Sequence, residues 1–285
     1  MNPANNPTAS GSTAGAVIGC ALEAALYAAA VAVAAVVSGA VSAAVDQLTE
    51  DGEITGSTVA SHILDFSAAD VLIALAVVDA GVILLLGRQL TRPQPAGSLS
   101  AVPGSLFLWL MLFVFALQTA LTAVHQWFSV GIGWFGVTFP ALSELPLEWL
   151  LLAALLHPLA SELLFRGTMV RRLEEAGASR ATVVFLPALL FALVQPSLGL
   201  MVVGFAFGAA AGLVYRRTGS LGLVIVAHTM LLAAAVIAAR IIDDAARTDL
   251  AIAVYAVVGA LAALCAGRMV WRALRRPEAL GSEAA

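Results

Sequence analysis

Apolar residues recur along this chain in runs long enough to cross a lipid bilayer. A helix needs roughly 20 of them, because it rises ~1.5 Å per residue and the hydrocarbon layer is ~30 Å thick. Eight runs qualify, at 14–45, 68–87, 105–124, 147–166, 181–195, 198–215, 220–240 and 249–268. Pro and Gly in the segment QPSLG favour a tight turn between the fifth and the sixth run. The pattern predicts an all-α, polytopic membrane protein with about eight transmembrane helices.

The polar segments divide the chain into parts. We predict a disordered tail at 1–12, an N-terminal helix pair at 13–87, a cytoplasmic linker at 88–105, a membrane domain at 106–270 and a cytoplasmic tail at 271–285. The linker is rich in Pro, Gly and Ser, a composition typical of flexible connections. The tail lacks the positive charges of a signal peptide, so we expect the first helix to be retained. The segment 125–149 carries three tryptophans, which favours an interfacial or re-entrant position.

The composition agrees with a chain that lies mostly in lipid. Hydrophobic residues make up 61% and charged residues 11%, with a mean hydropathy of +0.97, whereas a soluble domain has about 25% charged residues. No basic run with interleaved aromatic residues is present, so nucleic-acid binding has no support. Cys20 and Cys265 lie in apolar stretches, where we expect reduced packing residues. Two cysteines form no metal cluster, and we expect no metal or cofactor.

The positions of the arginines predict which loops of the membrane protein face the cytoplasm. All 14 basic residues are arginine. If the N-terminus is cytoplasmic, all of them except Arg240 and Arg247 fall on the cytoplasmic side, as the positive-inside rule requires. An even number of helices then places the C-terminus in the cytoplasm as well.

Acidic residues inside the apolar runs are the candidates for chemistry. In HPLASELLFRG (157–167), Glu162 and Arg166 are spaced i, i+4 with the acid first, which is the favourable order on a helix. Either charge alone is costly in an apolar environment, so we expect a coupled pair. Glu23 and Asp79 either belong to a proton or ion path or, as single buried acids, are protonated or paired with a neighbouring helix.

Three segments together resemble the CPBP family of membrane proteins, which contains the CAAX prenyl endopeptidases and bacteriocin-processing enzymes. They are ASELLFRG, LLFALVQ and GLVYRRTGSLGLVIVAHTMLL, within roughly residues 145–240. The family pattern is Glu-Glu-x-x-x-Arg, then Phe-x-x-x-His, then His-x-x-x-Asn or Asp. The resemblance implies a CPBP-like helical core and the inner membrane of a bacterial cell. The second glutamate of the pattern matches Glu162, its arginine matches Arg166, and its last histidine matches His228.

Three other positions depart from the family pattern. The first glutamate, the general base that activates water in the family, is replaced by Ser161. The histidine that helps to form the oxyanion site is replaced by Gln195, and the final Asn or Asp by Leu232. A serine hydroxyl is not basic and needs a base of its own to act as a nucleophile. Glutamine still donates a hydrogen bond but cannot shuttle protons.

The spacing of these positions predicts one shared cavity. Ser161 and Gln195 are equally far from a hairpin turn near Ala178, so they reach similar depth in an antiparallel helix pair. With His228 they are expected to line a cavity open to the cytoplasm. Glu162 is turned by about 100° from Ser161 on an ideal helix, which predicts that it faces away from this cavity.

His157 is the other polar group near Ser161. It precedes Ser161 by one helical turn, so a His157–Ser161 dyad is conceivable. We expect instead that backbone or water satisfies His157.

Three functions are compatible with these residues. The first is a non-proteolytic CPBP-family protein that binds a peptide or lipidated segment, or that scaffolds a membrane protein partner within the lipid bilayer. The second is an active intramembrane endopeptidase whose rearranged site uses Glu162, Gln195 and His228. The third is an ion- or proton-coupled transporter that uses Glu23, Asp79 and Glu162, although no inverted repeats support it. The loss of three family positions favours the first.

The arginine distribution yields a topological prediction. With both termini cytoplasmic, 46–68 and 125–147 lie outside. A membrane-impermeant thiol reagent added to intact cells should modify the variant Glu53→Cys and leave Arg275→Cys unmodified. Modification at 275 and not at 53 would reverse the assignment.

Overall fold

Helices form all of the regular structure in the described part of the chain. The computed structural model describes residues 7–50, 68–89, 102–127, 147–195, 198–245 and 249–275. The elements are α1 (Pro7–Glu50), α3 (Ala68–Leu86), η2 (Gly87–Gln89), α4 (Gly104–Trp127), α5 (Leu147–Glu162), η4 (Leu163–Val170), α6 (Arg171–Glu175), α7 (Arg180–Leu193), α8 (Leu198–Thr218), α9 (Leu221–Ala245) and α10 (Asp249–Arg275). Because α5, η4 and α6 follow one another without a break, each predicted run is confirmed as helix.

The boundaries of the predicted parts fall partly outside the described residues. Helix α1 begins at Pro7, inside the segment predicted as a tail. The described chain stops at Gln89 and resumes in the segment before Gly104, so most of the predicted linker lies outside it. The same holds for most of the tryptophan-containing segment 125–149 and for the predicted tight turn at QPSLG.

Several helices have the length and apolarity of membrane spans. Among the described residues these are Thr13–Val45, Gly104–Leu121, Gly199–Thr218 and Leu250–Arg275, with shorter apolar helices at Arg180–Leu193 and Leu221–Ile237. Large apolar side chains stay exposed on their outer faces, for example Leu84, Leu250 and Leu264. A soluble protein rarely exposes so large an apolar area, whereas lipid solvates it. The fold is therefore that of a multipass membrane protein.

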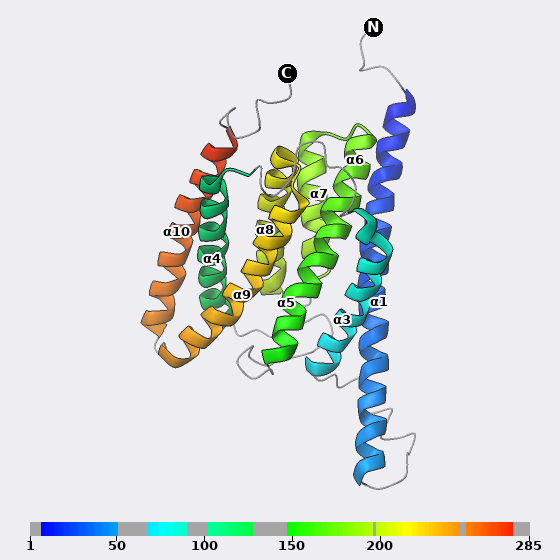
Figure 1. The fold of residues 1–285 in the computed structure, drawn as a ribbon, viewed down its shortest axis with the longest axis vertical. Coiled ribbons are helices and arrows are strands. Elements are labelled where there is room, and N and C mark those ends of the chain that lie inside the picture. Colours follow the sequence, from blue (N-terminus) through cyan, green and yellow to red (C-terminus); the bar gives the residue numbers. More distant parts are fainter. Residues whose placement is uncertain are drawn as a thin grey trace.

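The helices are arranged as a central group flanked by two pairs (Figure 1). Helices α5, α7, α8 and α9 lie in the middle, α4 and α10 pack together on one side, and α1 and α3 lie on the other. The start of α1, the α6–α7 turn and the end of α10 lie at the same end of the molecule. The Thr13 hydroxyl joins the start of α1 to the α6–α7 turn by donating a hydrogen bond to the Ala176 carbonyl at 2.8 Å.

The turn between α6 and α7 is the predicted hairpin near Ala178. Gly177 adopts a φ of 70°, a left-handed conformation that costs glycine least. Ser179 then caps α7, because its hydroxyl accepts a hydrogen bond from the Thr182 amide at 3.1 Å. These two residues end one helix and start the next, so α5–η4–α6 and α7 run antiparallel.

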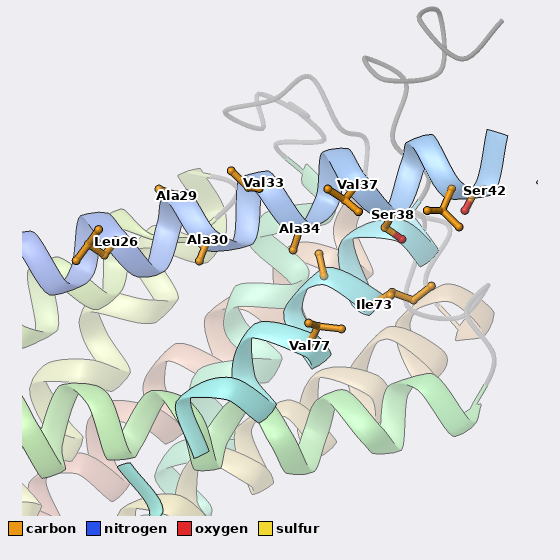
Figure 2. Close-up of a pocket in the computed structure, with 12 residues that line it drawn as sticks. Leu26, Ala29, Ala30, Val33, Ala34, Val37, Ser38, Ser42, Ile73 and Val77 are labelled. Carbon is orange, nitrogen blue, oxygen red and sulfur yellow. The ribbon is translucent and has the colours of Figure 1, made fainter. Parts of the chain in front are cut away.

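The N-terminal pair is joined by small and polar side chains. Ser38 and Ser42 of α1 donate to the Asp70 carboxylate of α3 at 3.1 and 2.8 Å. Figure 2 shows a groove between the two helices, lined by apolar side chains such as Ala34, Val37 and Val77. Its volume is about 790 Å³. The two hydroxyls already bond to Asp70, so the groove presents a mainly apolar surface.

Close backbone packing between α4 and α10 generates a stability prediction. A Cβ added at Gly259 would lie 2.7 Å from the Ala120 backbone nitrogen and 3.1 Å from the Ala116 carbonyl oxygen. Backbone atoms cannot yield without moving the helices apart. We expect Gly259→Ala to destabilise the protein by about 1–3 kcal/mol, as overpacking does, measured by thermal unfolding in detergent.

Gly81 provides the matched control for this change. It also lies inside a helix, but nothing lies within 4 Å of an added Cβ. Gly81→Ala should therefore be neutral or stabilising by up to ~1 kcal/mol. Equal effects of the two substitutions would show that the α4–α10 contact is not sterically tight.

Candidate functional site

A π-helix stands at the centre of the candidate site. The segment Leu163–Val170 follows α5 directly, and every residue in it except Thr168 is buried. The Thr168 hydroxyl donates to the Leu163 carbonyl five residues earlier, at 3.2 Å. Short π-helical segments are rare and occur frequently at functional sites. Five of its eight residues are apolar, which predicts a helix but does not distinguish a π-helix from an α-helix.

Glu162 and Arg166 form the predicted ion pair. Arg166 Nη1 donates to Glu162 Oε1 at 2.9 Å, and both side chains are fully buried. Arg166 Nη2 donates to the Gly208 carbonyl oxygen of α8 at 2.9 Å. The guanidinium carbon also lies 5.4 and 5.9 Å from the ring centroids of Phe191 and Phe207, within the range of cation–π attraction. The cation is thus compensated by an acid, a carbonyl dipole and two aromatic faces.

His228 of α9 binds the same carboxylate oxygen. Its Nδ1 lies 2.9 Å from Glu162 Oε1 and 3.4 Å from Ser161 Oγ. The prediction that Glu162 faces away from Ser161 and the shared site is therefore wrong. Adjacent side chains separated by about 100° can still reach one atom that lies between them, and the longer glutamate side chain spans the extra distance.

The directions of the hydrogen bonds determine whether His228 can act as a base toward Ser161. If the Glu162 carboxylate paired with Arg166 is ionised, it only accepts hydrogen bonds, and its contact with His228 then requires the proton on Nδ1. The Ser161 hydroxyl donates to the His157 carbonyl oxygen at 2.5 Å, which leaves only its lone pairs facing His228. A nitrogen that already carries a proton cannot remove one from serine. The geometry is therefore not that of a serine–histidine nucleophile, in which the base accepts from the hydroxyl.

Gln195 is not drawn into this cluster. Its side-chain amide donates to the Phe191 carbonyl on its own helix at 3.3 Å, and the residue is half-buried. Leu232 lies one turn beyond His228 on α9 and is also half-buried. The predicted convergence of Ser161, Gln195 and His228 is thus correct for the first and last only.

The expected open cavity is also absent at the described side chains of the site. Ser161 and Glu162 are 0% exposed and His228 is 2% exposed. These three side chains are therefore closed off from the molecular surface in this structure. Ser161, Glu162, Arg166 and His228 form a closed, polar cluster, and Gln195 and Leu232 are half-buried outside it.

A second polar cluster, which the sequence did not predict, lies beside the first. The Asp79 carboxylate of α3 accepts from the Tyr27 hydroxyl at 2.8 Å and contacts His157 Nδ1 at 3.2 Å. The expectation that backbone or water satisfies His157 is therefore wrong. The alternative in which Asp79 pairs with neighbouring helices is confirmed. The only signal in the sequence was the acid itself, because its partners lie far away along the chain.

Glu23 is likewise paired. Its carboxylate lies 2.6 Å from Arg172 Nη1, which joins α1 to α6. Both side chains are partly exposed, so this pair is worth less than a buried one. Among the described residues, no group of three or more His, Cys, Asp and Glu side chains is arranged to hold a metal ion.

This fold and site define a helical membrane protein with an acid–arginine–histidine cluster buried between its helices. Residues 143–234 match a family model described as type II CAAX prenyl endopeptidase Rce1-like. The matched segment includes the buried cluster and Gln195. No curated protein and no solved structure matches the chain. The match covers 92 of the 285 residues and supports the resemblance to the CPBP family over this segment.

The buried ion pair yields a coupling prediction. Arg166→Ala leaves the Glu162 carboxylate uncompensated in the protein interior, which can cost ~3–5 kcal/mol. The double variant Glu162→Gln with Arg166→Gln removes both charges and should be milder than the single change. Thermal unfolding in detergent of the two single variants and the double variant measures the coupling free energy. Strictly additive effects would show that the two groups stabilise the fold independently.

Proposed function

We propose that this chain is a non-proteolytic member of the CPBP family that acts by binding. The observation that carries the proposal is that protein partners already occupy one oxygen of the Glu162 carboxylate. Its Oε1 already accepts from Arg166 and His228, and the side chain is fully buried. The neighbouring position, where the family places the water-activating glutamate, holds Ser161. Its hydroxyl donates to a carbonyl and is not basic.

The binding partner is a membrane protein or a lipid-modified peptide. In this structure the cluster is closed, whereas the outer faces of the helices carry exposed apolar side chains and an apolar groove lies between α1 and α3. Such surfaces suit a scaffold that packs against other membrane segments. We place this scaffold in the inner membrane of a bacterial cell with both termini in the cytoplasm. The common location of the start of α1 and the end of α10 supports the shared side.

One observation favours an active endopeptidase as the second candidate. Glu162 Oε2 has no hydrogen-bond partner among the described residues, so one carboxylate oxygen remains to hold a water. His228 adjoins the same carboxylate. In this candidate Glu162 takes the role that the family gives to the residue before it.

The transport alternative has less support. It requires acids that exchange ions, yet Glu23, Asp79 and Glu162 each have a cationic or imidazole partner. We therefore do not propose transport.

Restoring the family residues tests the non-proteolytic proposal. General-base assistance is typically worth ~10²–10⁴ in rate, and residues that act as a unit are not additive. The natural chain should not cleave a panel of membrane-proximal and prenylated peptides. Any recovered cleavage should appear only in the combined variant Ser161→Glu, Gln195→His and Leu232→Asn, measured by mass spectrometry of the products.

A matched control separates the base from the change in size. The variant Ser161→Gln, Gln195→His and Leu232→Asn has the same side-chain volumes but lacks a carboxylate at 161. It should stay inactive. Robust cleavage by the natural chain, abolished by Glu162→Gln or by His228→Ala, would establish the second candidate instead.

A further inference from the structure

The N-terminal helix pair supplies two side chains at the edge of the family site. Tyr27 of α1 and Asp79 of α3 both lie outside the matched segment 143–234. Nevertheless they contact His157, which precedes Ser161 by one helical turn within that segment. Three helices that are far apart in sequence thus share one partly buried polar contact, in which Asp79 is buried and His157 is 18% exposed.

Asp79 is the residue that gives this contact its strength. It is 1% exposed, so water cannot compensate its charge. One carboxylate oxygen accepts from the Tyr27 hydroxyl and the other contacts His157 Nδ1. Removing one partner of such a buried pair leaves a charge or a polar group unsatisfied, which is costly in a protein interior. The free energy of this contact therefore depends on α1 and α3 staying docked on α5.

His157 connects this contact to the site behind it. Its ring lies 5.8 Å from the His228 ring in an edge-to-face arrangement, and its carbonyl accepts from the Ser161 hydroxyl. The order from the outside inward is therefore Asp79, then His157, then Ser161 and His228. A docked helix pair closes the side of the cluster on which His157 lies.

The other attachments of α1 are weaker. Towards the start of the helix, Thr13 bonds to Ala176 and Glu23 pairs with Arg172, and all four residues are at least partly exposed. The apolar contacts of this part of α1 come from the buried Ala16, Cys20 and Ala24 and the partly buried Val17. Small side chains bury little area, so they contribute little free energy per contact.

We propose that α1 and α3 form a displaceable lid over the family site and that the Asp79–His157 pair, with Tyr27, is its latch. In the observed structure the latch is closed and the cluster is sealed. Release of the latch lets the pair separate from α5 and exposes Ser161 and His228. The proposal rests on the proposed function for the identity of what enters, a lipid-modified or membrane-embedded peptide. Its test measures opening alone and is unaffected by whether the chain cleaves peptides.

A cysteine at the site reports the opening directly. The reporter is Ser161→Cys in a background with Cys20→Ala and Cys265→Ser, purified in detergent and treated with a small thiol reagent. Adding Asp79→Asn should raise the modification rate at 161 by roughly tenfold or more, because one buried hydrogen-bonded pair is lost. Asp70→Asn is the matched control, since Asp70 is also a buried acid of α3 but bonds to Ser38 and Ser42 of α1. It should leave the rate unchanged.

The natural Cys20 provides a second reporter on the helix pair itself. It is 0% exposed and its thiol lies 4.0 Å from the Met169 carbonyl oxygen of the π-helix. With Cys265→Ser alone, Asp79→Asn should also increase modification of Cys20. The exchanged pair Asp79→His with His157→Asp restores the contact and should return both rates towards those of the natural sequence. This rescue distinguishes release of a latch from a general loss of folding.

The labelling rates at the two cysteines determine whether the helix pair acts as a lid. Increased modification at both reporters, with rescue by the exchanged pair, supports it. Increased modification of Cys20 without any at position 161 would show that the helix pair moves but does not close the site. Unchanged rates at both positions, or equal increases with Asp70→Asn, would overturn the latch.

Discussion

One oxygen of the Glu162 carboxylate, shared by Arg166 and His228, is the contact around which the membrane domain is assembled. A fully buried charge is costly unless it is paired and hydrogen-bonded. Here the compensation comes from several helices at once. The acid belongs to α5, the arginine to the following π-helix and the histidine to α9. The fold satisfies these charges only if all three elements stay in register.

The surroundings of Arg166 extend this constraint to α7 and α8. Its guanidinium reaches the Gly208 carbonyl and lies between the rings of Phe191 and Phe207. A Cβ at Gly208 would lie 3.1 Å from the Ala188 Cα and 3.2 Å from Arg166 Nη2, so glycine permits this close approach. In this chain the acid–arginine motif thus positions helices. Both side chains of the motif are fully buried in this structure.

The sequence predicted the structural features that depend on local patterns of residues. Apolar run length predicted the helices, the i, i+4 spacing predicted the Glu162–Arg166 pair, and the turn near Ala178 followed from the antiparallel arrangement. The contact between Glu162 and His228 does not follow from the ideal-helix angle, because the length of the glutamate side chain also determines which atoms it reaches. The Asp79–His157 pair was missed for a different reason. Its partners are 78 residues apart, and no periodicity relates two positions on separate helices. Gln195 was expected at the site from its match to a family position and from its depth, but neither determines which way a side chain turns.

Thermal unfolding of the single variant Glu162→Gln tests the central claim most directly. If Glu162 is the structural anchor, glutamine leaves Arg166 without its counter-charge in a buried position. The midpoint should then fall by roughly 4–8 °C, as expected for the loss of a charged hydrogen-bonded contact in a domain of this size. Catalytic groups are often held at a cost in stability, so their removal leaves a protein equally or more stable. An unchanged or raised midpoint for Glu162→Gln would contradict the anchor and identify Glu162 as a residue retained for chemistry.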